Sequence, residues 1–144
     1  PDKLIKKLER SLVLVYTGKP HYSHTSNKLM IDNLIRGKNK DSLVRIREIA
    51  RQMKNSLLKK NLDDFAELMN QETKERKNLH RSIVPPKIEK IIKLGKKNGA
   101  VSAKICGAGG GGCILFFGDK KKLKKKFSGK VIDFKFDFQG LCWM

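Results

Sequence analysis

The stretch from Lys104 to Phe117, KICGAGGGGCILFF, constrains the fold most. Five glycines and one alanine at positions 107–112 separate two apolar segments that are typical of buried strands. A two-residue turn is enough to join such strands, and ordering consecutive glycines costs chain entropy. Close approach of the backbone to an anion, with N–H groups turned toward it, would offset that cost. The alternative use is a loose hairpin whose glycines only allow close packing.

The size of the chain predicts one domain. Its 144 residues are long enough for one hydrophobic core and too short for two ordinary domains, so we expect a single domain over residues 1–144. No apolar run in the sequence approaches the roughly 20 residues of a membrane span, and we expect no contact with a membrane. Three cysteines without C-x-x-C spacing favour neither a disulfide framework nor a zinc site, which predicts a cytoplasmic location.

The charge of the chain points to an anionic partner. It has 33 Lys and Arg against 14 Asp and Glu, a formal net charge of +19. Nucleic acid and phosphorylated substrates both fit this charge. Lysine outnumbers arginine, and this disfavours nucleic acid because bidentate recognition of bases and phosphates uses the arginine fork. A basic nucleic-acid-binding module remains the alternative.

The hydrophobic periodicity predicts an order of strands and helices. We expect strands at 11–18, 100–106, 113–119 and 130–140, and helices at 25–36, 41–60, 62–80, 85–98 and 120–127. Asn61 is placed to cap a helix, and Glu72 can pair with Arg76 one turn later. In the last segment Ile132, Phe134, Phe136 and Phe138 alternate with charged residues, which predicts a strand with one buried face. The fold class expected is α+β, an antiparallel sheet covered on one face by helices.

The glycine stretch resembles the third signature motif of the GHMP small-molecule kinases, roughly Lys-x-x-Gly-Ala-Gly-x-Gly-Gly before an apolar strand. The matching positions are Lys104, Gly107, Ala108, Gly109, Gly111 and Gly112, with Gly110 at the free position. The element order over the whole chain is similar to the C-terminal domain of that superfamily. The resemblance implies a ferredoxin-like sheet with extra helices.

A second stretch, LVLVYTGKPHYSHTSN, resembles the GHMP sugar kinases that phosphorylate heptose 7-phosphate. His21 stands where this resemblance leads us to expect arginine. The resemblance implies that a sugar phosphate and ATP are the ligands. It also implies that this chain has a substrate or phosphate site, but no catalytic residue and no metal ligand. The residues implied for that site are Lys104, Gly107, Ala108, Gly109, Gly110, Gly111, Gly112, Thr17, Gly18, Lys19, His21 and Ser23.

The family's ATP-binding loop, magnesium ligands and catalytic carboxylate are not found in this sequence. The resemblance therefore implies an N-terminal ATP-binding domain that is absent from this chain and would join it as a domain or subunit. ATP and Mg²⁺ would act in the complete enzyme, and this part alone would be inactive. A non-catalytic sugar-phosphate-binding domain is a further alternative, and self-association into a homo-oligomer could cover an exposed apolar patch.

Overall fold

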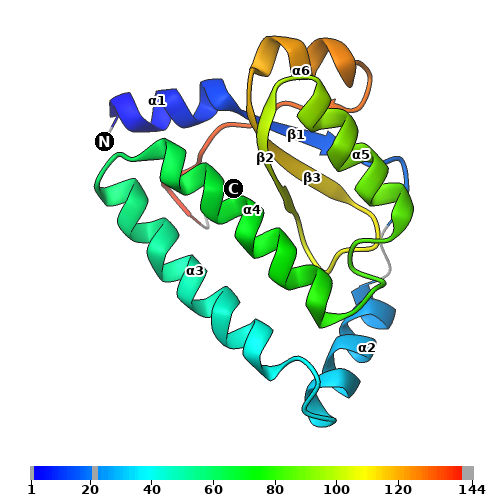
Figure 1. Cartoon of the computed structure of the whole chain (residues 1–144). Coiled ribbons are helices and arrows are strands. Elements are labelled where there is room, and N and C mark those ends of the chain that lie inside the picture. Colours follow the sequence, from blue (N-terminus) through cyan, green and yellow to red (C-terminus); the bar gives the residue numbers. More distant parts are fainter. Residues whose placement is uncertain (1, 21–22, 141–144) are drawn as a thin grey trace.

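The computed structural model describes residues 2–20 and 23–140 of the chain (Figure 1). The chain has a mixed α+β fold, in which four consecutive helices separate the first strand from the other three, as the sequence predicts. The helices are α1 Asp2–Ser11, α2 Ser23–Ile35, α3 Lys40–Leu58, α4 Leu62–Leu79, α5 Pro86–Lys97 and α6 Lys120–Lys126, and the strands are β1 Leu12–Tyr16, β2 Ala100–Ile105, β3 Cys113–Gly118 and β4 Val131–Ile132.

The sheet has the strand order β2-β3-β1-β4, and every neighbouring pair is antiparallel. This confirms the expected antiparallel sheet. Strand β1 lies inside the sheet, where it pairs with β3 on one side and with β4 on the other. Since β1 and β3 are neighbours, the segment that follows β1 and the segment that precedes β3 lie at the same end of the sheet.

The larger hydrophobic core lies on one face of the sheet. Val13 and Val15 of β1 point to this face, together with the fully buried Phe116 of β3. Helices α5 and α6 cover it and contribute Ile92 and Leu123 to the same cluster. These two helices form the layer that the sequence predicts on one face.

A second, smaller core lies on the opposite face, because successive residues of a strand point to opposite sides. Leu12 and Phe117 are buried there, next to Leu8 of α1 and Phe65 and Met69 of α4. The rings of Phe65 and Phe117 meet edge to face, 6.3 Å between centroids. The sequence patterns did not anticipate this second core.

Helix α4 also covers the open edge of the sheet. The side chain of Asn70 donates to the carbonyl of Val101 at 3.2 Å, and Thr73 donates to the carbonyl of Ala103 at 2.8 Å. An edge strand otherwise presents unpaired backbone groups to solvent. These two bonds fix α4 along β2, with its C-terminal half beside the segment that joins β2 to β3 (Figure 1).

Two segments differ from the sequence-based expectation. Residues 2–11 have no strong apolar pattern and yet form α1, because Leu4 and Leu8 lie one turn apart and pack on the second core. The predicted strand at 130–140 is wrong beyond its start, since only Val131–Ile132 pair with β1. Further along, the amide of Phe136 donates to the carboxylate of Glu9 in α1 at 3.1 Å. This N–H group is therefore bonded to a side chain of α1 and not to a neighbouring strand.

Other local predictions are confirmed. The side chain of Asn61 caps α4 by accepting a hydrogen bond from the amide of Asp64 at 3.1 Å. The lysine-rich segment after β3 forms α6 and buries Leu123 completely. Over residues 2–20 and 23–140, none of the helices is long and apolar enough to cross a membrane.

Candidate functional site

The glycine loop, residues Gly107–Gly112 between β2 and β3, packs between two other loops. The amide of Gly110 donates to the carbonyl of Ile83 at 2.8 Å, in the connection between α4 and α5. The amide of Gly112 donates to the carbonyl of Lys19 at 3.1 Å, and the amide of Thr17 donates back to Gly112 at 2.9 Å. The fold therefore brings the segment after β1 together with the glycine loop.

Two of these glycines pack closely on neighbouring loops, and at Gly109 an added Cβ would clash. Gly109 has φ +85°, and a Cβ there would lie 2.5 Å from Cγ2, 2.6 Å from the carbonyl oxygen and 2.8 Å from Cα of Ile83. A Cβ on Gly111 would lie 3.0 Å from the carbonyl oxygen of Pro20. Gly107 is different, because its φ is +72° and no atom lies within 4 Å of an added Cβ. Close packing thus explains why glycine is favoured at some positions of the run. At Gly107 the reason for glycine is the positive φ alone.

Several amides of the glycine loop have no internal partner. Among the residues that the structure describes, the N–H groups of Gly107, Ala108, Gly109 and Gly111 donate to no acceptor, and Gly109 and Gly111 are buried. Gly107 is exposed and Ala108 is half-buried, so a ligand in solvent can reach this part of the loop. Clustered N–H groups on a glycine-rich backbone are a common way to hold an anion.

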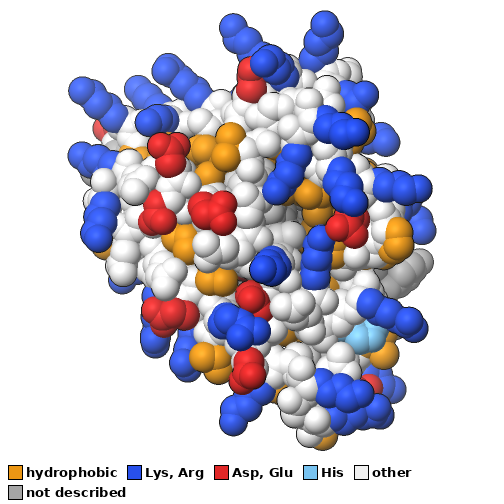
Figure 2. Space-filling model, viewed as in Figure 1, with side chains coloured by type: hydrophobic (Ala, Val, Ile, Leu, Met, Phe, Trp, Pro, Cys, Tyr) orange, Lys and Arg blue, Asp and Glu red, His pale blue; other side chains and the backbone are white. Residues whose placement is uncertain are grey.

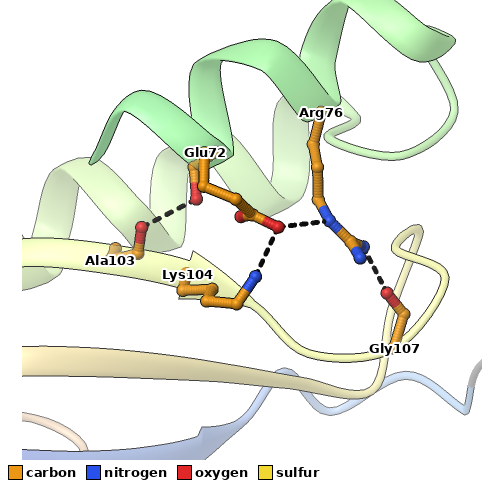
Figure 3. A network of polar contacts seen from close by, with 6 residues as sticks. Glu72, Arg76, Ala103, Lys104 and Gly107 are labelled. Carbon is orange, nitrogen blue, oxygen red and sulfur yellow. Dashed lines mark hydrogen bonds and ion pairs between the residues drawn. The ribbon is translucent and has the colours of Figure 1, made fainter. Parts of the chain in front are cut away.

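A charged network on α4 and β2 holds the start of the glycine loop (Figure 3). Glu72 is 4% exposed, and its Oε1 accepts from Nε of Arg76 at 2.9 Å and contacts Nζ of Lys104. Nη1 of Arg76 donates to the carbonyl oxygen of Gly107. The predicted pairing of Glu72 with Arg76 is confirmed, but sequence spacing gave no signal for the link to Gly107.

The remaining residues implied for the site lie around the segment after β1. Thr17 is buried, and its Oγ1 has no hydrogen-bond partner within residues 2–20 and 23–140. Gly18, with φ +76°, and Lys19 are exposed beside the glycine loop. Ser23 begins α2, and His21 lies outside the described residues. Thr17 and Lys19 are therefore hydrogen-bonded to the glycine loop through their backbone, with Gly18 between them.

Cys106, the cysteine before the glycine loop, does not have the properties of a nucleophile. Burial raises the pKa of the Cys106 thiol above its ordinary value of 9.0, and the neighbouring Cys113 raises that pKa further. A thiol in this state stays protonated near neutral pH, whereas a reactive cysteine needs its thiolate. Within the described ranges, no group of three His, Cys, Asp or Glu side chains is placed to hold a metal ion.

The surroundings of the site include a hollow and a strongly basic surface. The hollow, of about 340 Å³, is lined by Arg76, Gly107 and Ala108 together with apolar side chains such as Met30 and Ile46. Figure 2 shows Lys and Arg side chains around the rim of one face of the molecule, with acidic side chains gathered over α3 and α4. On this face the positive charge does not form one continuous stripe.

Comparison with known proteins identifies the relatives of this chain. Residues 53–134 match the family model described as GHMP kinases C terminal. The chain is 30% identical, over 96% of its length, to a D-glycero-alpha-D-manno-heptose 7-phosphate kinase from Campylobacter jejuni, and it spans 42% of that protein. The crystal structure of the Methanococcus jannaschii mevalonate kinase has a TM-score of 0.60 at 28% identity, over 88% of this chain and 39% of that one. A D-glycero-D-manno-heptose 1-phosphate kinase from Bacteriodes thetaiotaomicron has a TM-score of 0.60 at 19% identity, over 94% of this chain and 35% of that one, which supports the fold alone.

Proposed function

The chain belongs to the GHMP kinase family, and we propose that it is the substrate-side, C-terminal domain of an ATP-dependent sugar kinase. The proposed acceptor is a sugar like heptose 7-phosphate. This assignment is supported by the 30% identity to a heptose 7-phosphate kinase over 96% of the chain. Because the chain spans 42% of that relative, we propose that the ATP-binding half belongs to a separate domain or subunit.

The observation that carries the proposal is the set of unpartnered amides on the glycine loop. The N–H groups of Gly107, Ala108, Gly109 and Gly111 have no acceptor among the described residues, and Lys19 lies exposed beside the loop. Amides supply direction and a lysine supplies charge, which together suit a phosphate group. We propose that these groups bind the phosphate of the sugar substrate, and that Thr17 and Gly18 line the binding site next to it.

Phosphoryl transfer to a hydroxyl needs in-line geometry, neutralisation of the charge on the transferred group and a base for the hydroxyl proton. The part proposed for this chain is to bind the sugar phosphate and orient its hydroxyl. Glu72, the carboxylate next to the glycine loop, contacts both Arg76 and Lys104, so it fits neither a base nor a Mg²⁺ ligand. ATP, when bound, supplies the phosphoryl group, and we place the base and the Mg²⁺ ligands in the partner domain.

A thermal-shift titration tests the proposal. The chain is titrated with heptose 7-phosphate, galactose, Mg-ATP and a random oligonucleotide, each at low and high salt. We expect heptose 7-phosphate to raise the melting temperature, galactose to have little effect, and the Lys19→Met variant to lose most of the shift. Lys126→Met, which removes a lysine of α6, serves as the matched control and should keep the shift.

The titration also tests the alternative of a basic nucleic-acid-binding module, which rests on the net charge of +19. Binding through phosphate contacts weakens steeply with salt, linearly in the logarithm of its concentration. A shift with the oligonucleotide alone, lost at high salt, would therefore contradict the sugar-kinase proposal. A shift with heptose 7-phosphate at both salt concentrations supports it.

A further inference from the structure

We propose that Arg76, held by Glu72, is a positioning residue that fixes the orientation of the Gly107–Ala108 peptide in the glycine loop. This inference deepens the proposed function and rests on it for the role of the loop in binding phosphate. Its structural part stands on contacts that do not involve any ligand.

The first step is the hydrogen bond between Arg76 and the glycine loop. Nη1 of Arg76 donates to the carbonyl oxygen of Gly107, while Nε of the same guanidinium donates to Glu72 at 2.9 Å (Figure 3). The guanidinium group carries its donors in a rigid plane, so engaging one partner fixes the direction in which it presents the other donors. Glu72 therefore aims Arg76 at the carbonyl of Gly107.

The second step concerns the peptide group itself. In a trans peptide the C=O of one residue and the N–H of the next point in opposite directions. With the carbonyl of Gly107 turned toward Arg76, the N–H of Ala108 is turned away from it. If this peptide rotated by half a turn, the N–H of Ala108 would face the guanidinium, and two donors would oppose each other.

The third step is the freedom of this peptide without Arg76. Gly107 has φ +72°, and an added Cβ would meet no atom within 4 Å, so side-chain packing does not hold its conformation. Glycine adopts positive and negative φ with similar ease. The amides of Gly107 and Ala108 also have no acceptor among the described residues, and so they do not restrain the peptide. Among the described contacts, the hydrogen bond from Arg76 is thus the one that restrains the Gly107–Ala108 peptide.

The burial of the network supports a specific role. Glu72 is 4% exposed, its Oε1 faces both Arg76 and Lys104, and its Oε2 accepts no hydrogen bond from the part of the chain that the structure describes. A buried ion pair often stabilises a fold no better than apolar side chains of similar volume. An arrangement of this kind is better suited to fixing one geometry than to adding stability.

Nuclear magnetic resonance of the ¹⁵N-labelled chain tests the inference without a ligand. In Arg76→Met the amide signal of Ala108 should split or broaden as the peptide exchanges between two orientations. Hydrogen exchange at the neighbouring Gly110 amide, which is bonded to Ile83, should become at least about tenfold faster. Arg76→Lys keeps the charge but cannot engage Glu72 and Gly107 in the same planar geometry, so an intermediate effect is expected.

A matched control is available in an arginine that pairs with another glutamate of α4. Arg45 of α3 pairs with Glu75 of α4 at 3.0 Å, and neither residue has a contact with the glycine loop among the interactions of the described residues. Arg45→Met should leave the signals of Ala108 and Gly110 unchanged. If Arg76→Met fails to fold, Arg76→Lys and Glu72→Gln provide the same comparison with smaller changes in side-chain shape.

The outcomes separate this inference from the proposed function. Unchanged Ala108 and Gly110 signals in a folded Arg76 variant would overturn the positioning role, whatever the chain binds. Altered signals, together with at least about tenfold weaker binding of heptose 7-phosphate, would support both proposals. Altered signals in a chain that never binds heptose 7-phosphate would keep the positioning role and contradict the proposed substrate.

Discussion

Replacing Gly109 by alanine tests whether the glycine loop is held tightly against Ile83. Two separate effects oppose the substitution. The φ of +85° disfavours any residue with a Cβ by about 1–2 kcal/mol. In addition, the new Cβ would lie 2.5–2.8 Å from three atoms of Ile83, two of them in the backbone, and such overpacking costs about 1–3 kcal/mol. Together we expect Gly109→Ala to lower the free energy of unfolding by about 2–5 kcal/mol.

Gly107→Ala is the matched control for this substitution. Its φ of +72° carries the same backbone penalty, but no atom lies within 4 Å of the added Cβ. Both variants also lose the same amount of chain entropy in the unfolded state, so this contribution cancels in the comparison. Gly107→Ala should therefore cost only about 1–2 kcal/mol.

Urea unfolding followed by circular dichroism gives the two free energies. The contact with Ile83 predicts that Gly109→Ala is less stable than Gly107→Ala by about 1–3 kcal/mol, with a similar dependence on urea concentration. Equal destabilisation of the two variants would refute the reasoning, because it would mean that the loop does not pack on Ile83 in solution.

Three further predictions concern the scaffold. Asn61→Ala removes the side-chain cap of α4 and should cost about 1 kcal/mol in urea unfolding. Leu123→Ala should cost about 2–5 kcal/mol because this side chain is fully buried, whereas Val101→Ala, at a residue 60% exposed, should change stability by less than about 1 kcal/mol. A hydrogen bond from Lys77 holds the pKa of Glu89 below its ordinary value of 4.5, so the stabilisation by this group is present above pH 4.5 and is lost as the pH falls through the folded-state pKa. The Glu89→Gln variant should therefore lose less stability on acidification than the unmodified chain, by about 0.5 kcal/mol or less, and an identical pH dependence would contradict this assignment.

The regular part of the fold could be predicted from local patterns. Apolar residues at helical spacing identify α3, and the short β-rich apolar run that ends at Gly18 identifies β1. The cap at Asn61 follows from residue type and position alone. These features depend on residues close in the sequence, so one sequence contains their full signal.

Features that depend on tertiary contacts could not be predicted in this way. Helix α1 is stabilised because Leu4 and Leu8 pack on the second core, whose other residues lie far along the chain. The aromatic alternation after Ile132 favoured a long strand, but pairing with β1 stops there and the backbone turns to Glu9 of α1 instead. Alternation of apolar and charged residues therefore indicates that a segment could form a strand, but it does not show that a neighbouring strand is available to pair with it.

The candidate site illustrates the same limit. Its glycines are evident in the sequence, because a run of residues without side chains is rare and chemically specific. The contact of Gly109 with Ile83 and the bond from Arg76 to Gly107 join positions 26 and 31 residues apart, so no local pattern encodes them. The ammonium of Lys104 contacts Glu72, which gives this residue a structural partner beside its predicted contact with phosphate.

The most direct test of the central claim follows the glycine-loop amides while heptose 7-phosphate is added to the ¹⁵N-labelled chain. The proposed function predicts that the amide signals of Gly107, Ala108, Gly109 and Gly111 shift most, since these groups have no acceptor among the described residues. The amides of Gly110 and Gly112, which already donate to Ile83 and Lys19, should shift less. Signals of the glycine loop that stay in place at saturating ligand would contradict the assignment of this loop to the sugar phosphate.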